Sequence, residues 1–192
     1  MSTEGAKSQD VVTAGVARGG PATAGAKAHG EYLIECFDKD GNLKWSTKVP
    51  NLVVNVGLQD MNTKYFTGSS YTAAWYIGLY GAGATNSPAA GDTMASHAGW
   101  TEVTAYSNAN RPTATFGTAT TADPSVISNS ASPATFNING TATVGGAFLV
   151  NNNTKGGSTG TLFSASDFTG GDRSVGNNDT VNVTYTFNLD AA

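Results

Sequence analysis

Residues 180–189, which read TVNVTYTFNL, carry the clearest secondary-structure pattern in the chain. Every second residue there is a large apolar one, namely Val181, Val183, Tyr185, Phe187 and Leu189. A period of two is typical of a β-strand with one buried face and one solvated face. The pattern therefore predicts a strand whose five apolar side chains face a core.

Similar strand-like runs, separated by turn residues, occupy most of the chain before this one. They lie at residues 32–37, 42–47, 50–55, 73–80, 100–106, 111–117, 126–129, 134–138, 141–150 and 161–164. One helix is expected near residues 57–66, because Leu58, Met61 and Tyr65 share a helical face. The sequence thus predicts an all-β fold, a single immunoglobulin-like or jelly-roll-like β-sandwich over residues 31–192 with one short helix.

The composition excludes several classes of function. Charged residues make up 12% of the 192 residues, against roughly 25% in an average soluble protein. Lysine and arginine total 10 while aspartate and glutamate total 14, so the net charge of −4 disfavours a nucleic-acid partner. Cys36 is the single cysteine, which excludes an intrachain disulfide. No signal peptide or apolar run of membrane-spanning length is recognisable, so we expect synthesis in the cytoplasm and no membrane partner.

Asp92, Ser96 and His97 lie close together in the sequence and invite a catalytic-triad interpretation. Adjacent Ser96 and His97 would point apart on an extended loop, and no nucleophile-elbow motif accompanies them. The favoured interpretation is a structured loop, with Trp100 in the core and Asp92 or Glu102 bonded to loop amides. We therefore expect no enzyme activity.

Two further motifs resemble ligand sites only superficially. Residues 38–42 resemble a calcium loop, but the glycine is misplaced and the closing glutamate is missing, so a turn is expected. Residues 81–86 begin like a dinucleotide loop but lack its third glycine and its βαβ context. With only His29 and His97 as histidines, no metal or other cofactor is expected.

Six aromatic residues leave two interpretations open. They are Tyr71, Trp75, Tyr76, Tyr80, Trp100 and Tyr106. Aromatic rings in a small sandwich usually fill the core, which is the favoured interpretation. The rival interpretation is an aromatic platform that binds sugars.

Residues 1–30 are rich in glycine and alanine and lack any aromatic residue, leucine or isoleucine. This range is too poor in large apolar groups to build a core, so it is expected to be a flexible or extended N-terminal arm. Val11, Val12, Val16 and Arg18 are its candidate contacts with a neighbouring subunit. A solvated tail without a partner is the alternative.

Several longer motifs carry a family resemblance. They are NVGLQD at 55–60, GSSYTAAWYIGL at 68–79, DTMASHAGWTE at 92–102, RP at 111–112, SNSASP at 128–133 and KGG at 155–157. Over residues 31–189 the chain resembles a family of tailed-bacteriophage virion proteins encoded among the capsid genes.

The resemblance implies a head decoration or cement protein on the capsid surface of the virion, and it supplies no catalytic residues. The partners that it implies are the major capsid protein and neighbouring copies of the chain, with a trimer as the expected oligomer. Alternatives are a tail or fibre component that contacts the host, and a carbohydrate-binding β-sandwich module.

Overall fold

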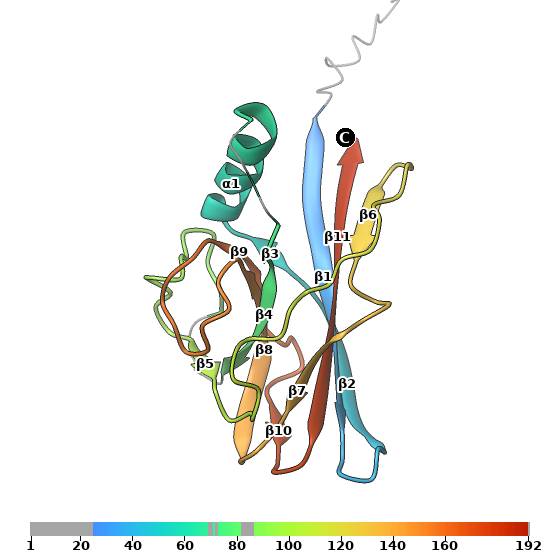
Figure 1. Cartoon of the computed structure of the whole chain (residues 1–192), viewed down its shortest axis with the longest axis vertical. Helices are drawn as coiled ribbons and strands as arrows, with labels where there is room; N and C mark the ends of the chain where they lie inside the picture. The colour runs from blue at the N-terminus through green and yellow to red at the C-terminus, as the bar shows by residue number, and fades with distance from the viewer. Residues whose placement is uncertain (1–24, 69–70, 72, 82–86, 192) are drawn as a thin grey trace, which may run out of the picture.

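The computed structural model describes residues 25–68, 71, 73–81 and 87–191, which form two antiparallel sheets packed face to face (Figure 1). The expected all-β, sandwich-like fold with one helix is confirmed. Most of the buried apolar side chains lie between the sheets in one cluster, which includes Tyr32, Ile34, Leu79, Phe136 and Val183.

The first sheet is built around the two longest strands, β1 (Ala26–Phe37) and β11 (Thr180–Ala191). They pair along their whole lengths, from Ala26 opposite Ala191 to Phe37 opposite Thr180. On either side of this pair lie β2 (Leu43–Pro50), β6 (Ser125–Ser128) and β7 (Ala134–Asn137). Because β1 begins at Ala26, residues 26–30 of the expected arm belong to this sheet.

The second sheet is centred on β8, which pairs with three other strands. Its members are β3 (Leu52–Val53), β9 (Leu162–Ala165), β8 (Ala142–Val150), β4 (Tyr76–Gly81), β5 (Thr101–Val103) and β10 (Arg173–Val175). β10 lies in a range for which no strand was expected. The expected strand at 111–117 is wrong: it is reduced to one bridge between Thr113 and Tyr76, and Pro112 has no N–H to donate to a ladder.

The only helix in the described part of the chain, α1 (Asn55–Phe66), packs beside β9. Gly57 permits the close approach, because a Cβ at this position would lie 2.4 Å from the carbonyl oxygen of Phe163. Of the expected apolar face, Met61 packs against the core, whereas Leu58 and Tyr65 are exposed. The helix therefore leaves aromatic side chains in solvent at its C-terminal end.

β11 follows the predicted alternation but not over its whole length. Val181, Val183 and Tyr185 are buried, Phe187 is half-buried, and Leu189 is 38% exposed. The expectation that Leu189 faces the core is wrong, because β1, β11 and β6 rise beyond the second sheet at this end (Figure 1). The sandwich is therefore open where β1 begins.

Candidate functional site

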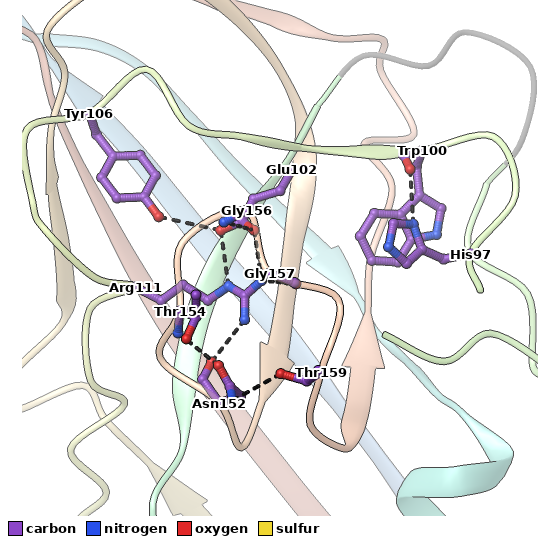
Figure 2. Close-up of polar contacts among 10 residues, drawn as sticks. All are labelled: His97, Trp100, Glu102, Tyr106, Arg111, Asn152, Thr154, Gly156, Gly157 and Thr159. Atoms are coloured by element: carbon purple, nitrogen blue, oxygen red, sulfur yellow. Dashed lines mark hydrogen bonds and ion pairs between the residues drawn. The ribbon is translucent and has the colours of Figure 1, made fainter. Parts of the chain in front are cut away.

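The most buried ion pair of the described residues joins Arg111 to Glu102 of β5 (Figure 2). The Arg111 side chain is fully buried and donates two hydrogen bonds to the carboxylate, of 3.0 Å from Nε and 2.7 Å from a terminal nitrogen. Its remaining hydrogen bonds reach the carbonyl oxygens of Asn152 and Gly157, at 2.8 and 2.7 Å. The guanidinium is thus fully committed to the protein itself.

Glu102 is equally occupied. Its carboxylate accepts the Gly156 N–H at 2.8 Å and the Tyr106 hydroxyl at 3.3 Å. Burial and the negative charge of Glu102 raise the pKa of Tyr106, so the phenol stays protonated as a donor. The expected bond between Glu102 and a loop amide is confirmed, and the network ties the loop after β5 to the loop after β8. We assign it a structural role.

Asp92 and His97 both bind Trp100, which is buried in the core as expected. Oδ2 of Asp92 accepts the indole N–H at 3.0 Å and the Ala89 N–H at 2.9 Å, which confirms the expected amide contact. His97 stacks on the indole at 4.0 Å between ring centroids, and its Nδ1 lies 2.9 Å from the Trp100 carbonyl oxygen (Figure 2). This arrangement builds a loop around a tryptophan, and it leaves the triad interpretation without support.

The 38–42 segment is a hairpin turn. Oδ1 of Asp38 accepts the backbone N–H groups of Asp40 and Asn42, at 2.8 and 2.9 Å, and Gly41 has a φ of 81°. Hydrogen bonds from Asn42 lower the pKa of Asp38. Among the residues that the structure describes, no group of three or more histidine, cysteine, aspartate or glutamate side chains is placed to hold a metal. None of the described helices is both long and apolar enough to cross a bilayer.

Cys36 is a buried free thiol beside Asp179, which precedes β11. Burial, and then the charge of Asp179, raise the pKa of the thiol to about 11. The Asp179 carboxylate accepts hydrogen bonds from Lys44 and from the Gly176 N–H. Cys36 is therefore held as an unreactive thiol.

An apolar cavity with a volume of about 460 Å³ opens between α1 and the ends of the two sheets. Its walls are formed mainly by Met61, Trp75, Phe116, Leu149, Phe163 and Phe187. Phe163 makes edge-to-face contacts with Trp75 and Phe187, each at 5.5 Å between centroids. Asp60 and Lys64 of α1 also line the cavity and give it one acidic and one basic group.

Exposed apolar side chains lie on two of the elements that line this cavity, α1 and β11. Tyr65 is 80% exposed and Phe66 77% exposed at the end of α1, and Leu189 lies on the uncovered end of β11. Of the six aromatics considered as a sugar platform, Tyr80, Trp100 and Tyr106 are buried in the core. Only Tyr71 and Trp75 line the cavity, so the six residues form no common platform.

The expected arm contacts Val11, Val12, Val16 and Arg18 lie outside the described residues. The cavity was not predicted from the sequence, because its walls come from α1, four strands and the loops between them. No family model, curated protein or solved structure matches the chain. The geometry of this open apolar end is therefore the main structural guide to function.

Proposed function

We propose that the chain is a virion structural protein, a head decoration or cement protein that binds the outer capsid surface and stabilises the lattice by subunit contacts. The observation that carries this proposal is the open apolar end, where an apolar cavity is lined by the exposed Tyr65 and where Phe66 and Leu189 are also exposed. Contiguous exposed apolar surface is typical of an interface with another protein.

The polar groups favour the same kind of function. The buried Arg111 and Glu102 bond to each other and to the protein's own backbone, so their network offers no charge to a substrate. A formal net charge of −4 over 192 residues keeps repulsion between copies weak. Such a surface suits dense packing on a lattice.

The proposed partners are those that the sequence resemblance implies. We propose the major capsid protein and neighbouring copies of this chain, arranged as trimers on the capsid surface. Under this proposal the open apolar end lies against another subunit in the assembled particle, which removes Tyr65 and Phe66 from water.

The test uses purified particles that lack this chain, with the full-length protein added back and bound protein measured by sedimentation. We expect saturable binding and greater resistance of the particles to heat. The double variant Tyr65→Glu/Phe66→Glu should lose binding, because it places charge in the apolar interface. Leu43→Glu is the matched control, since Leu43 is 55% exposed at the start of β2, and this end of β2 lies away from α1 (Figure 1).

Failure of the unmodified protein to bind these particles would contradict the capsid assignment. Binding of glycans at the Tyr71 and Trp75 surface, in place of particles, would instead support the carbohydrate-binding alternative.

A further inference from the structure

α1, which lines the open apolar cavity, and the start of β1 lie at the same end of the molecule (Figure 1). Phe187, one of the walls of the cavity, pairs with Gly30 of β1, and Gly30 is four residues from Ala26. A strand rises about 3.4 Å per residue, so Phe187 in the cavity wall lies about 14 Å along the β1–β11 pair from Ala26. The described chain thus begins, at Gly25, at the same end of the molecule as the cavity.

The composition of residues 1–24 suits binding in a shallow apolar site. Val11, Val12 and Val16 are the only β-branched apolar residues of this segment, and glycine, alanine, serine and threonine make up most of the rest. Small residues let a backbone approach a surface closely, while each valine can fill part of a pocket. The segment therefore has few apolar anchors, the adjacent Val11 and Val12 and, four residues later, Val16.

An acidic side chain in the cavity indicates how the segment would be oriented there. Asp60 lines the cavity and makes no ion pair or hydrogen bond with any residue that the structure describes. In an extended chain Val16 and Arg18 point to the same side, because side chains alternate with a period of two. With Val16 in the cavity mouth, Arg18 can therefore reach Asp60.

We propose that residues 8–20 of a second copy of this chain dock in the cavity, with Val16 entering it and Arg18 pairing with Asp60. This inference rests on the proposed function, in which copies lie side by side. β1 remains paired with β11 up to Ala26, beyond the level of the cavity, so a segment that reached the cavity of its own chain would have to reverse direction. A segment from a neighbouring copy needs no reversal to reach the cavity.

Docking on a second copy links subunits through many weak contacts. Each segment is tethered to its own folded domain, so it binds at a high effective concentration when the domains are held on one surface. The same segment can also reach the cavity of its own chain, since the ten residues from Val16 to Ala26 span up to about 35 Å. The experiment must therefore separate the two sources.

Disulfide trapping in full-length protein makes this separation. One copy carries Val16→Cys and another carries Tyr65→Cys, at the exposed rim of the cavity. The native Cys36 is buried and does not interfere. We expect the mixed copies to form a cross-linked heterodimer under mild oxidation, at least ten times more than Val16→Cys forms with the control Leu43→Cys. Adding Arg18→Glu should reduce the yield, and combining it with Asp60→Arg on the partner copy should restore the yield.

Equal cross-linking to Tyr65→Cys and Leu43→Cys would overturn the proposal. So would a Val16→Cys/Tyr65→Cys double variant that forms mainly an intramolecular disulfide, and few cross-linked dimers, at the protein concentration used for the mixed copies. The assay contains no particles, so its failure alongside intact particle binding would remove this inference alone. Cross-linking without particle binding would instead remove the capsid assignment and leave the docking site.

Discussion

Arg111 and Glu102 illustrate how a buried ion pair can be accommodated at the level of single residues. Taking both charges out of water is costly, and the cost is offset only when every donor and acceptor finds a partner. Here the two carbonyl oxygens, the Gly156 amide and the Tyr106 hydroxyl complete the network. The pair therefore fixes two loops in place rather than serving a substrate.

Replacing Arg111 with methionine should destabilise the fold by about 3–5 kcal/mol, because Glu102 would be left buried without its partner. The free energy of unfolding in urea measures the effect. Lys39→Ala, which breaks an exposed pair with Asp40, is the control and should cost less than about 1 kcal/mol. Similar losses in both variants would contradict the structural role of Arg111.

Asp179 predicts how stability depends on pH. Burial alone would raise its pKa, but hydrogen bonds from Lys44 and the Gly176 N–H outweigh burial and hold the pKa below the ordinary 3.8. A depressed folded-state pKa means that the stabilisation is complete above pH 3.8 and is lost as the pH falls through the lower, folded-state value.

We therefore expect Asp179→Asn to lose less stability than the unmodified protein between pH 5 and strongly acidic pH. Urea unfolding at a series of pH values tests this expectation. Identical pH profiles for the two proteins would show that Asp179 contributes nothing to acid sensitivity.

Among the secondary-structure elements, β11 shows which structural features its sequence pattern predicts and which it does not. The alternation of Val181, Val183 and Tyr185 correctly predicts a strand and its buried face. The same pattern cannot tell how far the opposing sheet extends, so Leu189 was wrongly placed in the core. The position where the facing sheet ends depends on the lengths of its own strands. The alternating pattern of β11 contains no information about those lengths.

Tyr185→Ala should cost roughly 3–5 kcal/mol of unfolding free energy, as for other large buried aromatics. Leu189→Ala, four residues further along the same strand, should cost less than about 1 kcal/mol because the side chain is already 38% exposed. Chemical denaturation of both variants provides the comparison. A loss at Leu189 as large as that at Tyr185 would place the end of β11 in a core.

In α1, helix propensity and packing predict opposite effects of one substitution, Gly57→Ala, on the stability of the protein. Glycine to alanine normally stabilises a helix by about 1 kcal/mol. At Gly57 the added Cβ would lie 2.4 Å from the Phe163 carbonyl oxygen, so Gly57→Ala should instead destabilise the protein. The exposed Asn62→Ala is the control and should be neutral or slightly stabilising. A higher melting temperature for Gly57→Ala would mean that α1 is not packed on β9.

In the candidate site, too, one feature could be predicted from the sequence and another could not. The bond from a loop amide to Glu102 was predictable, because acidic residues in turn-rich segments commonly accept backbone N–H groups. The cavity was not, since Met61, Trp75, Phe116 and Phe187 are far apart in sequence and meet only when the two sheets pack. The spacing of these four residues along the sequence does not distinguish them from ordinary core residues.

Considered as a whole, the molecule has two dissimilar ends. The hairpin end is closed by a turn in which Asp38 caps the backbone, whereas the opposite end exposes Tyr65, Phe66 and an apolar cavity. This polarity gives the protein one surface suited to burial against another subunit. A decoration protein that joins copies on a capsid needs such a surface and requires no catalytic group.

Quantitative mass spectrometry of purified virions measures the number of copies of this chain relative to the major capsid protein. We predict a fixed, high ratio set by the capsid lattice, because a decoration protein occupies every equivalent lattice position. Absence of the chain from virions, or the few copies of a tail component, would contradict the proposed function.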